Sequence, residues 1–486
     1  MPRMREVALR SIAASGLLAM GGCSLAPEYV KPTIGPLPES FKGAAAPAGW
    51  VVADPGDTIS RGGWWKVYRD PVLDALEVKL DANNPDLSIA LSRLDTSRAY
   101  LEQLNADQAP RMGASASPTN DRQSDRRPLR GSNQPNEYDT RTVGLSTNYE
   151  LDLWGRIRNE VAEGKAQTQA AEADLASAQL SLQARLADLY IKLRGYDIES
   201  RIVQDSLGAF SDGQDMTQKR LDGGVSSGLD LARANVLFSD AQAQATELRV
   251  QRALTEHAIA TLIGEPASSF SLPPALQDAE IVLPVIPLGV PSSLLQRRPD
   301  IAAAERRAFA ANAGIGVARA AFYPDIGLSA AFGWQDVGHG SLLAASNQFW
   351  SLGPLASMNL FDGGLRRGRE AEAKAEFATA SAQFRSVVLH AFQQVEDNLS
   401  LLQELGRESQ QETAAAMAAR QSQTLATNRY NQGVVSYLEV VTAQTAALNA
   451  ERTAELVHTR QLQASVDLIR ALGGGWVEAP GQPEKQ

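Results

Sequence analysis

Alternation between apolar and small or polar residues marks four short segments of the chain. Between Asp325 and Gln335, apolar residues occupy every second position from Ile326 to Trp334, while Gly, Ser and Ala occupy most of the positions between them. Segments 111–120, 140–151 and 349–360 alternate in a similar way. Strands of about ten residues with this period are typical of a transmembrane β-barrel with a wet interior, although a soluble antiparallel sheet alternates likewise. The pattern therefore predicts four strands.

A different period follows each pair of predicted strands. Segments 156–221 and 365–430 contain no proline and carry apolar residues at helical spacing. At about 1.5 Å per residue, each would form a helix of roughly 100 Å. Leucines 182, 186, 189 and 193 keep the four–three–four spacing of a coiled coil. Each long helix ends at a glycine-containing turn, after which segments 229–263 and 437–472 are predicted to return as helices.

The two halves of the chain repeat the same pattern. The Pro-Asp pair at Pro85 recurs 214 residues later at Pro299, and the turn glycine Gly224 recurs 209 residues later at Gly433. Such persistent offsets indicate an internal duplication with a short length difference between the paired strands. We expect an extended N-terminal segment at 23–70, a first repeat at 71–264, a proline-rich linker at 265–298, a second repeat at 299–472 and a C-terminal tail at 473–486.

The N-terminus has the features of a secretory signal. Arg3, Arg5 and Arg10 precede a short apolar run that ends in Gly21-Gly22-Cys23. Small residues before the only cysteine of the chain indicate a lipoprotein signal over residues 1–22, with lipid attached to Cys23. Ser24, in place of an aspartate, favours export to the outer membrane. The alternative is an ordinary signal peptide.

Composition and motifs argue against several classes of function. The net charge of −10 disfavours a general nucleic-acid binder, and no stretch of 18 apolar residues predicts a transmembrane helix. The sequence GVSSG at 224–228 fits the pattern of a hydrolase nucleophile, but it is expected to join two helices rather than a strand and a helix. We therefore expect no catalytic residues, no metal site and no cofactor.

Four strands are too few to close a barrel in one chain. A bacterial transmembrane barrel has about eight strands or more and leaves no edge facing lipid. Two chains would supply eight strands and three would supply twelve. A channel wide enough for cargo favours three.

These features together resemble the outer-membrane factor family, the TolC-like channels of tripartite efflux pumps. The resemblance is greatest to the lipidated branch that serves resistance-nodulation-division pumps. It covers nearly the whole mature chain and rests on Cys23, the duplicated Pro-Asp helices, Tyr323-Pro324 before a strand, NLFDGG at Asn359 and the two glycine turns.

The resemblance implies an α+β membrane protein. It would be a homotrimer with a 12-stranded transmembrane β-barrel, four strands per chain, continued by a long α-helical coiled-coil barrel through the periplasm. Such a protein is not an enzyme. It is a passive outer-membrane exit duct for drugs or other small molecules, and its partners are a periplasmic adaptor (membrane-fusion) protein and an inner-membrane pump.

The resemblance also implies a gate at the periplasmic tips. Tips that contact the adaptor would centre on Gly224-Val225 and Gly433-Val434. A gate would link Tyr430 to Asp230, and Glu439 would belong to an acidic ring. Val435 and Thr442 depart from gate residues of some family members. The other interpretation is that Asp230 and Glu439 are N-terminal acids that stabilise helix dipoles.

Two other functions remain open at this stage. One is a type I secretion channel of the same family. The other is a non-channel helical periplasmic lipoprotein such as an adaptor or scaffold, which would be expected to show one hairpin instead of two. The sequence does not name the transported substrate or the pump.

Overall fold

The computed structural model describes residues 24–35, 41–42, 63–126, 135–275, 281–286, 297–338 and 340–474. The signal segment and Cys23 therefore lie outside the described residues. In chain order the elements are η1 (Trp64–Tyr68), α2 (Pro71–Asn83), α3 (Pro85–Ala106), β1 (Arg111–Arg122), β2 (Glu137–Glu150), α4 (Arg156–Asp222), α5 (Gly228–Leu262), α7 (Pro299–Ala320), β3 (Asp325–Asp336), η3 (Ala345–Asn347), β4 (Gln348–Ser357), α8 (Leu365–Asn431) and α9 (Tyr437–Ala471).

The chain forms two compact units. The first includes Arg93–Glu172 and Ala303–Phe384, and it contains the whole sheet. The second includes Ala173–Ala302 and Arg385–Gln486, and it contains both helical tips.

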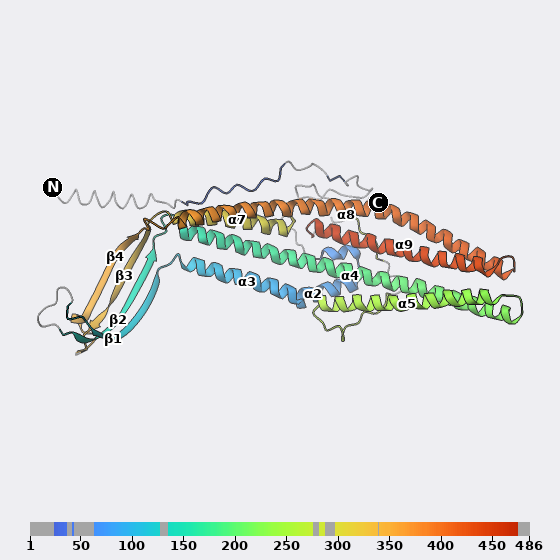
Figure 1. Ribbon diagram of the computed structural model, residues 1–486, viewed down its shortest axis with the longest axis horizontal. Coiled ribbons are helices and arrows are strands. Elements are labelled where there is room, and N and C mark those ends of the chain that lie inside the picture. The colour runs from blue at the N-terminus through green and yellow to red at the C-terminus, as the bar shows by residue number, and fades with distance from the viewer. Residues whose placement is uncertain are drawn as a thin grey trace, which may run out of the picture. The chain divides into compact units, whose positions relative to one another are not determined.

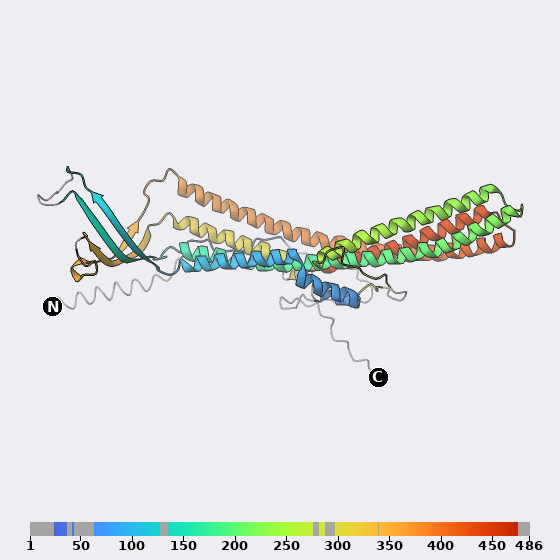
Figure 2. The same cartoon turned by 90° about the horizontal axis from the view of Figure 1, so that it is seen from below.

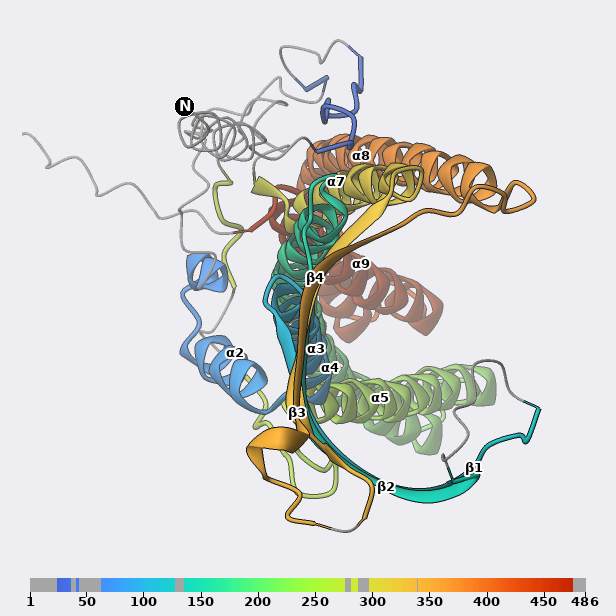
Figure 3. The same ribbon diagram turned by 90° about the vertical axis from the view of Figure 1, so that its left-hand side faces the viewer.

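The four strands form one antiparallel sheet in the order β1-β2-β3-β4. Figures 2 and 3 show the strands following one another along a curved path. The register places Leu145 opposite Phe332, and Phe332 opposite Trp350. Because side chains alternate across a strand, the apolar positions of neighbouring strands then share one face of the sheet. That face carries Val143, Leu145, Tyr149, Leu328, Phe332, Trp334, Trp350 and Leu352.

The opposite face is built mainly from small or polar residues, with Phe349 and Leu355 as large apolar exceptions on β4. Gly144 pairs with Gly333, which in turn pairs with Phe349. A Cβ atom at Gly333 would lie 2.9 Å from the Phe349 ring, so the ring lies across these two glycines. Glycine is required at Gly333 because a neighbouring backbone and an aromatic ring both approach it closely.

Strand β4 is shorter than the sequence predicts. It ends at Ser357, whereas the alternation predicted a strand through Leu360. Ser357 pairs with Asp325, the first residue of β3, and the preceding Pro324 has no N–H to extend the ladder. Trp154 donates a hydrogen bond of 2.8 Å to the Pro324 carbonyl and stacks on Tyr323 at 4.7 Å, which holds the transition from α7 to β3 in place.

The long helices are continuous and occur in matched lengths. Helices α4 and α8 have 67 residues each, and α5 and α9 have 35 each. Within the second unit, Figure 1 shows α4–α5 and α8–α9 as two hairpins whose turns lie at the same end. Among the helices of the described ranges, none has the length and apolar content needed to cross a bilayer.

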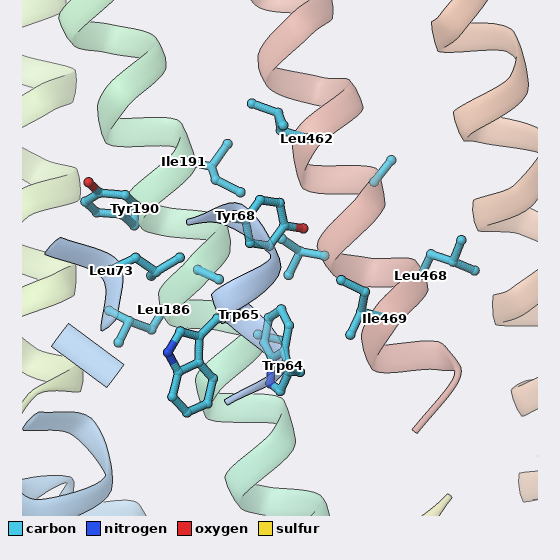
Figure 4. Packing of buried hydrophobic residues seen from close by; sticks show 14 of the residues in the cluster. Trp64, Trp65, Tyr68, Leu73, Leu186, Tyr190, Ile191, Leu462, Leu468 and Ile469 are labelled. Carbon is cyan, nitrogen blue, oxygen red and sulfur yellow. The ribbon is translucent and has the colours of Figure 1, made fainter. Parts of the chain in front are cut away.

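The main hydrophobic core of the second unit joins the N-terminal helices to α4 and α9. Figure 4 shows η1 and α2 packed against these helices through Trp64, Leu73, Leu186 and Ile469. This core also contains a buried polar pair, since Tyr68 Oη and Ser465 Oγ lie 2.7 Å apart. This core holds together the helices that lead to the tips.

Candidate functional site

The two helical turns have the same backbone geometry. Gly224 and Gly433 have φ angles of +69° and +75°, which side-chain-bearing residues rarely adopt. In the first turn the Val225 N–H bonds to the Arg220 carbonyl at 2.9 Å, and in the second the Val434 N–H bonds to the Arg429 carbonyl at 3.0 Å. Both turns are therefore Schellman motifs, which satisfy the last carbonyls of a helix.

The tips present apolar side chains to solvent. Val225 and Val434 directly follow the turn glycines and are both largely exposed. Leu229 and Leu438 are also exposed in the first turns of α5 and α9. Exposed aliphatic groups at the end of each hairpin are suited to contact with a partner protein.

The returning helices begin with different caps. Ser227 and Asp230 form a capping box at α5, in which each side chain accepts a hydrogen bond from the other residue's backbone N–H. Ser436, the corresponding residue at α9, makes no side-chain capping bond. Glu439 instead lies 3.9 Å from the guanidinium of Arg429, and both groups are exposed. The duplicated turns therefore differ in their electrostatic contacts.

The expected hydrogen bond between Tyr430 and Asp230 is not formed within this chain. The Asp230 carboxylate is already engaged, since Oδ2 accepts from Ser227 Oγ at 2.9 Å and from the Ser227 N–H at 3.4 Å. Tyr430 is only 6% exposed, and its hydroxyl has no hydrogen-bond partner among the described residues. The capping role of Asp230 is thus the one that its observed contacts support.

Tyr430 contacts Arg220 of the other hairpin instead. The Arg220 guanidinium lies over the Tyr430 ring at 4.2 Å. Its Nη1 and Nη2 atoms both donate to the Tyr430 carbonyl at 3.2 Å, and Nη2 also approaches the Asn431 carbonyl at 3.4 Å. A cation there offsets the negative end of the α8 dipole and joins the two tips.

Tyr437 completes an aromatic pair at the start of α9. Its ring centre lies 5.3 Å from that of Tyr430, and it is 2% exposed. Burial raises the pKa of the Tyr437 phenol, Tyr430 and Asp230 raise it further, and nearby Thr217 partly opposes the shift. A Cβ atom at Gly213 would lie 2.9 Å from the Tyr437 hydroxyl, so glycine lets α9 approach α4.

Sequence reasoning identified the turns and Tyr430 but missed Arg220, Tyr437 and Gly213 as parts of this site. Arg220 had a usable signal, because a basic residue in the last turn of a helix often binds helix carbonyls. The structural role of Gly213 is to allow close packing against Tyr437. Among the described residues, no group of three or more His, Cys, Asp or Glu side chains is arranged to hold a metal ion.

Comparison with known proteins agrees with this architecture. The family model described as outer membrane efflux protein matches residues 77–265 and 290–474, which is well over half of the chain. OprJ, an outer membrane protein of Pseudomonas aeruginosa, is 31% identical over 481 residues, covering 98% of both chains. The toluene efflux pump outer membrane protein TtgC of Pseudomonas putida is 29% identical over 478 residues, again covering 98% of each.

Solved structures give the same result. The outer-membrane channel OprN aligns with a TM-score of 0.84 at 30% sequence identity, covering 93% of this chain and all of that one. The Campylobacter jejuni CmeC outer membrane channel has a TM-score of 0.86 at 21% identity and supports the fold alone. The chain therefore belongs to the outer membrane efflux protein family, and it is an outer-membrane protein that functions in efflux.

Proposed function

We propose that three copies of this chain close a 12-stranded transmembrane β-barrel that continues as an α-helical barrel into the periplasm. The assembly acts as a passive exit duct for drugs or other small molecules. An inner-membrane pump supplies the energy, and a periplasmic adaptor joins the pump to the duct.

The observation that carries this proposal is the four-stranded sheet with two unpaired edges. Strands β1 and β4 each have a neighbour on one side only. In a bilayer, unpaired backbone N–H and C=O groups are too costly to face lipid, so the edges must pair with other copies. The apolar side chains that strand pairing brings onto one face of the sheet would form a lipid-facing surface. The face of small residues is suited to line a pore.

The internal duplication supports a helical barrel in which two similar hairpins per chain alternate. The matched helix lengths and the two Schellman turns agree with such an arrangement. The family model also matches the chain in two separate segments of similar length.

The two tips are the proposed sites of adaptor contact and closure. Val225 and Val434, beside Gly224 and Gly433, would contact the adaptor. Tyr430 would hold the closed state through Arg220 and Tyr437. Asp230 would support that state by capping α5.

Two further assignments complete the proposal. Glu439 would contribute to an acidic ring at the tip, because its carboxylate is exposed beside the second turn. Cys23 would carry a lipid that adds membrane affinity to that of the barrel.

A reconstitution experiment tests the proposal. The protein purified in detergent should be a trimer by native mass spectrometry, and it should form discrete channels in planar bilayers. With a compatible adaptor and pump, it should restore drug resistance to cells that lack their own outer-membrane duct. A monomer without channel activity would contradict the proposal.

A further inference from the structure

A cavity lined by both polar and apolar groups lies between α4, α8 and α9 close to the tips. Its volume is about 480 Å³, which is within the usual range of roughly 300–1,000 Å³ for small-molecule sites. Tyr430, Tyr437 and Gln444 form part of its lining, and they are 6%, 2% and 4% exposed. The cavity therefore reaches side chains that are well over nine-tenths buried.

Two of those side chains share an unusual feature. Tyr430 Oη and Gln444 Oε1 are buried without a hydrogen-bond partner among the described residues, whereas the Tyr437 phenol lies close to Thr217. Buried polar atoms in folded proteins almost always have partners. Two such atoms on one cavity indicate an occupant that supplies hydrogen-bonding groups, and the Gln444 carbonyl oxygen in particular requires a donor.

The charged residues around the cavity indicate whether that occupant is a cation or an anion. Asp205 and Asp212 on α4 are exposed and have no ion-pair partner among the described residues. Glu451 is neutralised by Arg420 at 2.7 Å. The lining thus carries two uncompensated carboxylates, while the Arg220 guanidinium lies on the Tyr430 ring. The part of the cavity that Asp205 and Asp212 line therefore favours a cation.

Other residues of the lining are apolar and could contact a hydrocarbon segment of the occupant. Ala209 and Met216 of α4 and Val440 of α9 contribute apolar surface, and the two tyrosine rings lie beside them. Aromatic faces and carboxylates together are the groups that recognise organic cations.

We propose that this cavity binds organic ammonium ions that carry a hydrocarbon segment. The N–H groups would donate to Gln444 Oε1 and to the Tyr430 phenol oxygen, while the positive charge would face Asp205 and Asp212. This inference deepens the proposed function and rests on it, because such amines would be cargo that binds beside the gate on its way out.

Equilibrium binding to the full-length protein purified in detergent tests the inference. Isothermal titration would compare 1,8-diaminooctane with 1,8-octanediol, which has the same length and no charge. The diamine should bind at one site per chain, and the diol should bind at least ~10-fold more weakly. Equal affinities, or no diamine binding because water or a neighbouring chain fills the cavity, would overturn the inference.

Matched variants locate the site. Asp212→Asn should weaken diamine binding by roughly 5-fold, because it removes one charge-assisted contact. Gln444→Leu should also weaken binding without destabilising the protein, since the lost oxygen has no partner to leave unpaired. Asp215→Asn, an exposed residue of α4 outside the cavity, is the control. A loss of affinity in the control as large as that in Asp212→Asn would overturn the assignment.

The proposed function and this inference fail in different ways. A trimer that conducts ions but does not prefer the diamine would remove the inference and leave the duct intact. A monomer that forms no channels would instead contradict the proposed function, whatever it binds.

Discussion

The guanidinium of Arg220 lies 4.2 Å from the centre of the Tyr430 ring and donates to the Tyr430 carbonyl oxygen at 3.2 Å. Arg220 is in the last turn of α4, and Tyr430 is in the last turn of α8. One side chain therefore joins the two hairpins of a chain through an aromatic face and through a helix terminus. The contact combines two stabilising effects at the end of the hairpins where the gate is proposed.

Removing this contact should loosen the tips. Arg220→Ala would remove charge-assisted hydrogen bonds worth about 1.5–3 kcal/mol and a cation–π contact worth about 0.5–2 kcal/mol. The expected result is a higher single-channel conductance in planar bilayers, because the closed arrangement loses a link between hairpins. Cells that express the variant should also become more sensitive to large antibiotics such as vancomycin.

Arg429 provides a matched control in the second turn. It occupies the position that corresponds to Arg220 after an offset of 209 residues. Its guanidinium is exposed and lies 3.9 Å from the Glu439 carboxylate, a contact of little energetic value. Arg429→Ala should leave conductance near that of the parent, and equal effects of the two variants would contradict the role assigned to Arg220.

Asp230 and Tyr430 should act independently. Asp230→Ala removes the capping box of α5 and should cost about 0.5–2 kcal/mol of stability. Tyr430→Phe removes a hydroxyl without a partner, so its own effect should be small. The double variant should conduct more than the parent, with a coupling energy below about 0.5 kcal/mol in a double-mutant cycle.

The cycle needs thermal unfolding and conductance of all four proteins. A coupling energy well above that limit would show that the phenol and the carboxylate do bond, either between chains or in another state of the channel. In that case the gate inferred from family resemblance would be correct and the capping interpretation incomplete.

Most of the fold could be predicted from local patterns in the sequence. The period-two segments predicted the strands because alternation is a property of neighbouring residues, and proline-free helical segments predicted α4 and α8 to within one or two residues. The predicted end of β4 was wrong because the strand ends opposite Asp325, which follows Pro324 at the start of β3, and alternation within β4 does not reveal this. Phe349 on the small-residue face likewise depends on Gly144 and Gly333 of other strands.

The site was less accessible to sequence reasoning. The glycine turns stood out because the duplication places Gly224 and Gly433 at equivalent positions. The contact between Arg220 and Tyr430 joins residues 210 positions apart, so it follows only from the packing of the hairpins. The sequence repeat does not reveal that the two turns differ, because Arg220 and Arg429 occupy matching positions but have different partners.

The two faces of β3 should respond differently to a charge. Leu328 lies on the apolar face, aligned with Tyr149 and Pro354, and Ser329 points to the opposite face beside Asn148 and Gly353. Leu328→Arg should impair trimer assembly, because arginine on the lipid face costs about 2–4 kcal/mol near the midplane. Ser329→Arg should preserve the trimer and change its conductance.

Semi-native gel electrophoresis of outer membranes measures assembly, and bilayer recordings measure conductance. The assignment of the faces fails if both variants assemble equally well, or if Ser329→Arg is the one that prevents assembly.

The lipid anchor at Cys23 can be tested directly. Cys23→Ala should abolish incorporation of radiolabelled palmitate, because the chain has no other cysteine. The barrel should still insert, since its strands would span the membrane without the lipid. Label that persists in the variant would show that Cys23 is not the modified residue.

Glu77 should make stability depend on pH. It is fully buried in α2, and neither carboxylate oxygen has a hydrogen-bond partner among the described residues. Burial, together with the nearby Asp81 and Asp74, raises the pKa of Glu77 from 4.5 to about 10. Between pH 4.5 and about pH 10, Glu77 therefore keeps its proton in the folded protein and loses it in the unfolded chain.

The sign of the effect follows from that difference. Below pH 4.5 Glu77 is protonated in both states, and its contribution to stability is fully present. As the pH rises from 4.5 toward 10, the unfolded chain alone ionises, so the free energy of unfolding falls. Glu77→Gln removes this titration, so the variant should gain stability relative to the parent as the pH rises. The gain should be clear at pH 8 and small near pH 4.

Thermal unfolding of the two proteins between pH 4 and pH 8 measures the difference, and Glu102→Gln, at an exposed position, is the control. If the stability of the parent and of Glu77→Gln changes with pH in the same way, Glu77 is not protonated in the folded protein.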